Sequence, residues 1–253
     1  VIDNSSAFRM DPEVPLVVPE VNPEAIKAHK GIIANPNCST IIMVMGLKPL
    51  YDIAKIRRIV VSTYQAVSGA GKEGMAELEE QVAALASGKE PVAKVLPVGK
   101  LPKHYQIAFN LIPQIDVFKD NLYTKEEMKM IDETKKIMGD DGMRITATTV
   151  RVPVYRSHAE SVNVEFEDKV TLEAARAAIA AFPGIILRDN PAEQEYPMPL
   201  FTSNKYDVEI GRLRYDESQE NTLNFWICGD QIRKGAALNA LQIAEYMIAH
   251  DLV

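Results

Sequence analysis

The sequence predicts an α/β protein in which helices cover one face of a mixed or antiparallel sheet. Two observations carry this prediction. Several segments rich in β-branched residues are long and have few helices between them, which is typical of such a sheet. Other segments show the apolar spacing or the capping residues of helices. With 253 residues, the chain can bury one large core or two smaller ones.

The predicted strands are short buried runs near the start of the chain and longer runs after it. They cover residues 16–18, 31–33, 55–64, 145–155, 161–166, 207–214 and 222–228. The predicted helices cover residues 40–50, 73–86, 124–138, 171–182 and 234–250. In the second helix, one face carries Met75, Leu78, Val82 and Leu85.

Local signals support two of these helices and one irregular segment. Thr124 is a good N-cap, and Glu127 three residues later completes a capping box for the third helix. The alanine-rich helix over 171–182 is stopped by the Pro-Gly pair at 183–184. Residues 91–113 are rich in proline, so this segment is predicted to be irregular.

Composition excludes several classes of protein. The net charge of −7, with no basic stripe or tail, argues against nucleic-acid binding. No apolar run is long enough to cross a bilayer, and no signal peptide is visible. The two cysteines, Cys38 and Cys228, make no disulfide framework, which fits a reducing cytoplasm. No metal site is predicted. The chain begins without methionine and within a strand pattern, so we expect an N-terminal part to precede it.

The segment Asn35-Pro36-Asn37-Cys38-Ser39-Thr40 is the strongest candidate for chemistry. It follows an apolar strand and precedes an apolar helix, so Cys38 lies at or near a helix N-terminus. Unpaired N–H groups and the helix dipole favour an anion there, which predicts a lowered pKa for the thiol and a reactive thiolate. The same N–H groups could hold an oxyanion. The alternative is a buried cysteine that only packs.

A second motif, over residues 69–74, matches the dinucleotide fingerprint G-x-G-x-x-G letter for letter. A strand precedes it and a helix follows, but the chain then becomes proline-rich and no clear parallel strand closes a βαβ unit. We therefore expect a glycine loop that approaches a ligand closely rather than the main nucleotide site.

Polar residues also interrupt segments that otherwise resemble core. They are Gln65 after a strand, Glu126 and Lys129 on one helix face, Arg151 within a strand, and His158 beyond it. Each has a plainer interpretation: a solvated helix pair, a structural ion pair or a loop histidine. Arg151 and His158 are seven residues apart, so an unbroken strand would place them on opposite faces. A bulge or turn, aided by Pro153, is required if both face Cys38.

Taken together, these segments resemble the aspartate-semialdehyde dehydrogenase family. The resemblance runs from the first residue to the last helix and is carried by VIDNSSAFRM, VPEVNP, NPNCST, STYQAVSGAGKEGM, AFNLIPQID, MKMIDETKKIM and GDQIRKGAALNALQIAE. It is weakest over residues 186–203. It implies an α+β catalytic domain like that of glyceraldehyde-3-phosphate dehydrogenase, with a mixed sheet, plus the tail of a Rossmann-like NADP-binding domain. The family's glycine-rich βα turn for NADP is not present in this chain.

The resemblance implies a reversible reaction in which aspartate semialdehyde, NADP and phosphate give aspartyl phosphate and NADPH. Cys38 would attack the aldehyde, hydride would leave to the nicotinamide, and phosphate would attack the resulting thioester. The matching residues have the following implied roles. His158 is the acid/base, Gln65 orients the substrate, and Asn37 lies beside the oxyanion. Arg151 grips the substrate carboxylate, Glu126 faces its amine, and Arg9 and Lys129 bind phosphate. Ser68, Gly69 and Gln231 lie near the nicotinamide.

The same resemblance implies a homodimer in which each chain has three segments. Residues 1–38 would end the NADP-binding domain, residues 39–229 would form the catalytic and dimerisation domain, and residues 230–253 would form a helix returning to the nucleotide domain. Three alternatives remain open at this point. They are the related N-acetyl-glutamyl-phosphate reductase, a cysteine hydrolase using Cys38 and His158, and a non-catalytic remnant that keeps only the dimer interface.

Overall fold

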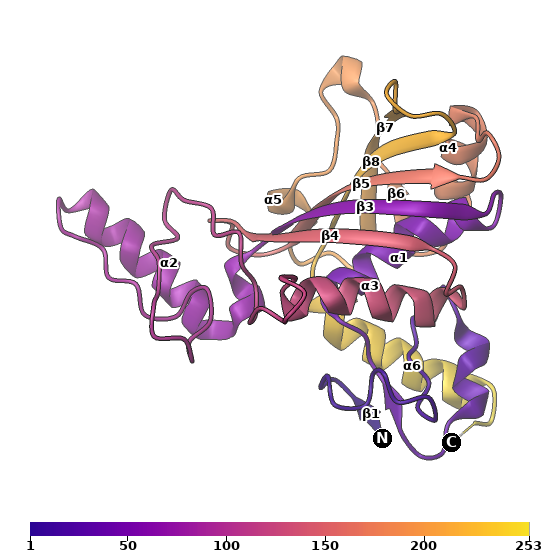
Figure 1. The fold of residues 1–253 in the computed structure, drawn as a ribbon, viewed down its shortest axis with the longest axis horizontal. Coiled ribbons are helices and arrows are strands. Elements are labelled where there is room, and N and C mark those ends of the chain that lie inside the picture. Colours follow the sequence, from indigo (N-terminus) through magenta and orange to yellow (C-terminus); the bar gives the residue numbers. More distant parts are fainter. Residues whose placement is uncertain (253) are drawn as a thin grey trace.

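A central six-stranded mixed sheet organises the chain, as the sequence predicts. The structure is a computed structural model and describes residues 1–252. The strands lie in the order β4-β3-β5-β8-β7-β6 (Figure 1). Their bounds are β3 Ile56–Gln65, β4 Arg144–Arg151, β5 His158–Phe166, β6 Ile185–Leu187, β7 Val208–Tyr215 and β8 Thr222–Gly229. The β3–β4 and β6–β7 pairs are parallel, and the other pairs are antiparallel.

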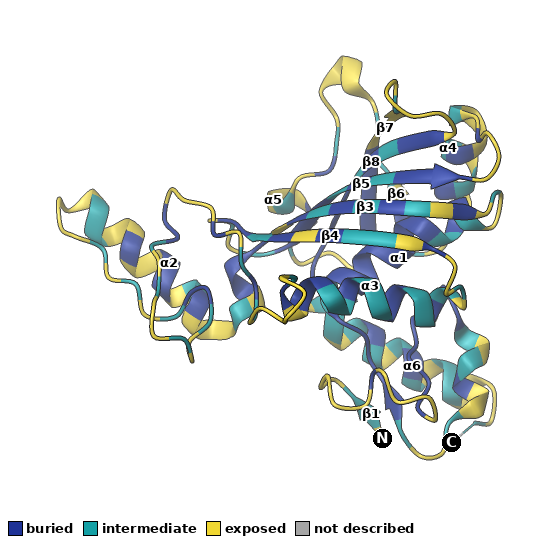
Figure 2. Cartoon of the chain, in the orientation of Figure 1, coloured by how far each residue is buried: buried dark blue, intermediate teal, exposed yellow. Residues whose placement is uncertain are grey.

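Helices cover one face of this sheet. The central one, α1 (Cys38–Tyr51), lies behind the strands in Figure 1 and packs against β3, β5, β7 and β8. It is buried along almost its whole length, which explains why its sequence is apolar on all sides. It is flanked by α3 (Lys125–Met138) and α4 (Leu172–Ala181). The opposite face of β3 and β4 carries no long helix and includes half-buried and exposed residues (Figure 2).

The two ends of the chain pack together below the sheet in Figure 1. There β1 (Ile2–Asp3) pairs in parallel with β2 (Ile33–Ala34), beside the 3-10 helix η1 (Pro23–Ala28). The π-helical turn η4 (Arg233–Ala237) leads into α6 (Leu238–Ala249), which packs against β1 and η1. A small apolar core joins them through Val17, Ile26, Ile33 and Ile243. The last residue of the predicted C-terminal part, 253, lies outside the described residues.

The chain leaves β3 through the 3-10 turn η2 (Val67–Ala70) into α2 (Gly71–Ala86), which projects from the body in Figure 1. The proline-rich segment 91–113 folds back on α2 without a long helix or strand, as expected. Of the predicted apolar face, Leu78 is buried, and Met75 and Leu85 are partly buried. Val82 is exposed, so its place on a buried face of the helix was predicted wrongly. No strand follows α2 directly; the chain passes through α3 before it reaches β4.

Several predicted boundaries need correction. The strand predicted over 145–155 ends at Arg151, because the chain turns over residues 152–157 with Ser157 at a φ of 76°. The strand predicted over 16–18 is only a single bridge from Leu16 to Ala34. The final helix begins with a π-helical turn, and β6 was not predicted because three residues carry too little pattern. The capping box of α3 is present, with both reciprocal hydrogen bonds.

Candidate active site

Cys38 is the first residue of α1, as predicted, and its neighbour Asn37 is the N-cap. The Asn37 side-chain oxygen accepts from the backbone N–H groups of Ser39 and Thr40 at 3.1 and 3.2 Å. The Asn37 amide nitrogen donates to Glu126 at 3.0 Å, so the cap is itself fixed by α3. The turn that carries the cysteine is therefore held from two sides.

The sheet brings three of the predicted polar residues to one edge. Gln65 ends β3, Arg151 ends β4, and the two are paired in register. His158 begins β5 on the other side of β3, after the turn that the spacing required. The backbone of Ala66 anchors both flanking residues: its N–H donates to His158 Nδ1 at 3.1 Å, and its carbonyl accepts from Arg151 Nη1 at 2.7 Å.

Two glycines allow close approach around these side chains. A methyl group on Gly235 of η4 would lie 2.9 Å from Cys38 Cβ, so the last part of the chain touches the cysteine directly. A methyl group on Gly69 would lie 2.7 Å from Arg151 Nη1 and 3.4 Å from His158 Nε2. Gly69 is itself exposed. The backbone of the glycine loop thus packs closely against both residues, at a position where a larger side chain would clash.

His158 is fully buried and electrically neutral. Burial, followed by the nearby Arg151 charge, holds the pKa of His158 well below its usual value. Because Nδ1 accepts a backbone hydrogen bond, the ring proton of the neutral imidazole lies on Nε2. Within residues 1–252, neither His158 Nε2 nor Arg151 Nε has a hydrogen-bond partner. Both N–H groups are therefore buried donors without an acceptor among these residues.

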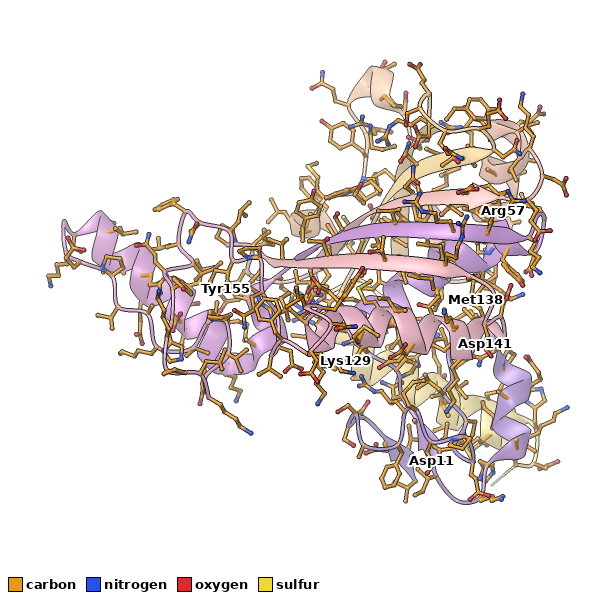
Figure 3. The ribbon with its side chains drawn as sticks, in the orientation of Figure 1. Asp11, Arg57, Lys129, Met138, Asp141 and Tyr155 are labelled. Atoms are coloured by element: carbon orange, nitrogen blue, oxygen red, sulfur yellow. The ribbon has the colours of Figure 1, made fainter. Side chains whose placement is uncertain are left out.

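Glu126 joins the elements of the site. Its carboxylate accepts from Asn37, from Gln65 Nε2 at 3.4 Å and from Lys129 Nζ at 3.1 Å. Lys129 also pairs with Asp116 at 3.1 Å and lies at the amino end of α3, far from Met138 and Asp141 (Figure 3). Glu126 is only 4% exposed, so the plainer interpretation as a solvated helix pair is wrong for the acid.

The predicted direction of the Cys38 pKa is wrong. Burial, with the negative charge of Glu126 second, raises the pKa of the Cys38 thiol to about 12. The Arg151 charge and the neighbouring Ser39 act in the other direction but are outweighed. The helix N-terminus is where the sequence predicted it, but desolvation decides the sign. In this state the sulfur is a thiol at neutral pH.

The remaining predicted residues lie in two places. Arg9 is buried and pairs with Glu133 at 3.1 Å, while Glu133 also accepts from the Asn37 backbone N–H at 2.6 Å. Arg9 thus pairs with Glu133, and Lys129 pairs with Glu126; both acids belong to α3. On the other side, Gln231 donates through its side-chain amide to Ser68 Oγ and accepts from the Ser157 N–H at 2.9 Å. Ser68 and Gln231 are therefore one contact pair next to Gly69.

Comparisons with known proteins give the family. Residues 47–234 match the family model described as "Semialdehyde dehydrogenase, dimerisation domain", and residues 1–29 match "Semialdehyde dehydrogenase, NAD binding domain". The aspartate-semialdehyde dehydrogenase of Aquifex aeolicus is 53% identical over 256 residues, which is 100% of this chain and 73% of the relative. The chain belongs to the aspartate-semialdehyde dehydrogenase family.

Solved structures agree with this assignment. Aspartate semialdehyde dehydrogenase II of Vibrio cholerae, complexed with ASA, has a TM-score of 0.91 and 47% identity, covering 98% of this chain and 72% of that one. The Candida albicans enzyme with NADP has a TM-score of 0.75 and 25% identity, covering 100% and 72%. The chain is thus an oxidoreductase of amino-acid biosynthesis. The relatives favour this function over the N-acetyl-glutamyl-phosphate reductase and hydrolase alternatives.

For this member of the aspartate-semialdehyde dehydrogenase family, sequence reasoning missed three residues around the site. Gly235 stands against Cys38, Lys234 lies in a buried polar cluster behind it, and Glu160 lies two residues after His158 with no exposed surface. For Glu160 a signal was present. Within β5 it occupies the alternating inward positions of His158, Val162 and Val164, where an acid is out of place.

Proposed function

We propose that this protein catalyses the phosphate- and NADP-dependent interconversion of aspartate semialdehyde and aspartyl phosphate through a thioester on Cys38. The observation that carries the proposal is the arrangement at the sheet edge: a cysteine at a helix start, a neutral histidine with a free Nε2–H, and an arginine with a free Nε–H. A thiol, a donor for an oxyanion and a planar cation for a carboxylate suffice to hold and convert an aldehyde acid.

Each side chain has a role that follows from its contacts. Cys38 adds to the aldehyde carbon, and its thiol proton passes to the carbonyl oxygen, giving a thiohemiacetal; the Nε2–H of His158 stabilises the charge that builds up on that oxygen. The tautomer set by Ala66 makes neutral His158 a hydrogen-bond donor to that oxygen. Arg151 binds the substrate carboxylate through the donors not used on Ala66, and Gln65 orients the bound substrate.

The charged residues on and beside α3 bind different groups, the substrate amine and phosphate. Glu126 is buried and lies one turn from Lys129, so it meets the substrate amine with a fixed negative charge. Lys129 and Arg9 supply cations for phosphate when it attacks the thioester. Asn37 fixes the position of Cys38 relative to Glu126, because its side chain forms hydrogen bonds with both the start of α1 and the Glu126 carboxylate.

The residues around Gly69 fit a nicotinamide. Gly69 is exposed and its backbone packs close to His158, and the adjacent Ser68–Gln231 pair carries a hydroxyl and an amide that would bond the carboxamide. NADP, when bound, takes up the hydride or supplies it. Ser68, Gly69 and Gln231 hold and orient it against Cys38. The NADP named for the Candida albicans relative supports NADP as the cofactor here.

The protein works as a homodimer in the cytoplasm. The family model over residues 47–234 is named for dimerisation, and the uncovered sheet face carries Tyr64 and Trp226 with ring centroids 5.3 Å apart. Its cysteines are free thiols, which fits a reducing compartment. No helix among residues 1–252 is long and apolar enough to span a membrane. Residues 1–38, 39–229 and 230–253 serve as nucleotide-domain end, catalytic and dimerisation domain, and returning helix.

One assay tests the proposal. The purified gene product is given aspartate semialdehyde, with NADP or NAD, at increasing phosphate, and NADPH or NADH formation is followed by absorbance. We expect turnover that saturates with phosphate, favours NADP and is absent with the N-acetyl-glutamate semialdehyde, whose blocked amine gives Glu126 no cation. Sustained turnover without phosphate or nucleotide would instead establish a hydrolase.

A further inference from the structure

Glu160 lies directly behind the residues of the proposed site. It follows His158 by two positions on β5, so the two side chains project from the same face of the strand. The sheet register places Glu160 opposite Thr63 of β3 and opposite Ile227 of β8. Thr63 in turn precedes Gln65 by two residues and accepts a hydrogen bond from its side chain at 3.3 Å.

These pairings define three rows across the inner face of the sheet. The first row is the proposed site: Arg151, Gln65 and His158. The second row, one step into the protein, is Thr149, Thr63 and Glu160. The third row is apolar and belongs to the main core: Ala147, Val61 and Val162. Glu160 thus belongs to the last polar row between the site and the core, and it is the only acid of that row.

The first turns of α1 cover this part of the sheet. A methyl group on Gly46 would lie 2.9 Å from the Ile227 side chain, and one on Gly229 would lie 3.1 Å from Ile42. These two contacts fix the face that α1 turns to the sheet. Ser39 lies on that face one turn before Ile42, next to Cys38. Through Ile42 and Gly46, α1 therefore packs over the β8 residues that pair with His158 and Glu160.

No described residue satisfies the Glu160 carboxyl group. Its exposure is 0%, and neither oxygen has a hydrogen-bond partner within residues 1–252; the hydroxyl of Ser39 is in the same condition. Burial, followed by the charge of Glu126, raises the pKa of Glu160 well above its usual value. The shift favours the protonated form, a carboxylic acid with one O–H donor. An apolar side chain of similar size would fill this place without leaving a buried polar group unpaired.

We propose that Glu160 is a positioning residue of this active site, whose buried carboxyl group fills the row behind His158 and Gln65 and keeps them aligned on Cys38. The inference rests on the proposed roles of those residues. The charged and titratable groups on the same face of the sheet as Glu160 are His158 on its own strand and Arg151 on β4, with Glu126 on α3 and Cys38 at the start of α1 beyond them. Cys228 on β8 and Glu209 on β7 lie on the opposite face. Ionised Glu160 would place a second negative charge near Glu126 and would disturb this row.

The test compares Glu160→Leu and Glu160→Gln with a matched control, Glu165→Gln. Glu165 lies on the same strand but on the opposite face, where it pairs with Arg57 and Arg144. We expect Glu160→Leu to lower kcat by about tenfold or more, with the KM for aspartate semialdehyde within about twofold and an unchanged or higher Tm. Glu160→Gln should keep most of the kcat, and Glu165→Gln should keep all of it.

The pH profile gives a second readout that a packing role would not move. Wild-type kcat should fall at alkaline pH as Glu160 ionises, and this fall should be absent in Glu160→Gln, which cannot ionise. A folded Glu160→Leu with wild-type kcat overturns the proposal. If Glu160→Leu does not fold, an alkaline fall that persists in Glu160→Gln overturns it. Wild-type turnover in the same assay separates these outcomes from a failure of the proposed function.

Discussion

Two buried polar regions lie on either side of Cys38, and they differ in how well their hydrogen-bonding groups are matched. Behind η4, the Lys234 cluster consists of Lys234, Glu20, Asn239 and Gln242. The lysine is 1% exposed, and its ammonium donates to the other three: to Glu20, to Asn239 at 3.0 Å and to Gln242 at 2.7 Å. Three donors thus meet three acceptors.

On the sheet side of Cys38, the matching is incomplete. His158 Nε2, Arg151 Nε and both oxygens of Glu160 are buried without a partner among residues 1–252. β3 and β5 each pair with a strand on both sides, so the unpaired groups at this place are side chains.

The contrast separates structural from functional polar groups. A fully matched cluster ties distant segments together, since Lys234 and Glu20 are more than two hundred residues apart and join α6 to the N-terminal part. Unmatched buried donors carry a cost that folding alone does not justify, so they indicate where a bound molecule completes the set. Substitutions in the first region should therefore lower stability, and those in the second should lower activity.

The largest expected effect is on the unmatched side, at Cys38. Cys38→Ser should reduce kcat by roughly a thousandfold or more, because a hydroxyl without strong activation is a much weaker nucleophile than sulfur. The Tm and the circular dichroism should be unchanged, since the hydroxyl is nearly isosteric. Cys228→Ala is the matched control, because that thiol is buried on β8 outside the site, and it should retain turnover. Wild-type kcat in Cys38→Ser would mean that another group is the nucleophile.

The next largest effect is expected on the stability of the fold, from a substitution in the Lys234 cluster. Lys234→Met leaves Glu20 buried without its cation, and breaking a buried pair in this way should cost about 3–5 kcal/mol in the free energy of unfolding. Lys48→Met is the control: Lys48 forms an exposed pair with Asp52 on α1, and its loss should cost less than about 1 kcal/mol. Urea unfolding measures both. Equal stabilities of the two variants would show that the Lys234 cluster does not hold the fold.

Arg151→Lys, on the sheet side of Cys38, should raise the KM for aspartate semialdehyde. An ammonium cannot bind the Ala66 carbonyl and a carboxylate in a planar fork, so about 1.5–3 kcal/mol of binding, or roughly ten- to a hundredfold in KM, should be lost. Unfolding free energy should change little. Arg188→Lys, in a half-exposed pair with Glu209 at the sheet edge, is the control for the chemical change. Steady-state kinetics decide, and an unchanged KM would assign the carboxylate to another cation.

Much of the fold and part of the site could be predicted from local pattern. The helix start at Cys38 and the capping box at Thr124 depend on neighbouring residues only, and both predictions are confirmed. The meeting of Gln65 with Arg151 is different. Their residue types drew attention, but their pairing depends on the register of two parallel strands joined through α2 and α3. No local signal fixes such a register.

Burial explains most of what the sequence could not give. The helix dipole predicted a lowered pKa for Cys38, but the strands and α3 that enclose the sulfur are distant in sequence, and their desolvation reverses the sign. Glu160 was missed for a similar reason, because an acid in a strand is ordinary until the face it occupies is known. Both errors concern how deeply a polar group is enclosed, which depends on tertiary packing rather than on neighbours in the chain.

The smallest expected effect concerns Lys129, which belongs to neither region fully. Its ammonium is matched by Glu126 and Asp116, yet its side chain remains 20% exposed, so it could both hold the acid and meet an anion. Burial opposes its charge, but Glu126 and Asp116 outweigh this and raise the pKa of Lys129, so it is a cation at neutral pH.

If Lys129 also binds phosphate, Lys129→Ala should raise the KM for phosphate by about tenfold, near the low end for one charge-assisted contact because two carboxylates already share the ammonium. The KM for aspartate semialdehyde should rise much less. A single-turnover burst of NADPH should survive, since the thiohemiacetal and hydride steps precede phosphate attack. Lys125→Ala, an exposed lysine at the start of the same helix, controls for loss of charge. Kinetics that vary phosphate at saturating aldehyde decide the question: an unchanged phosphate KM would leave Lys129 with only the task of fixing Glu126 and Asp116.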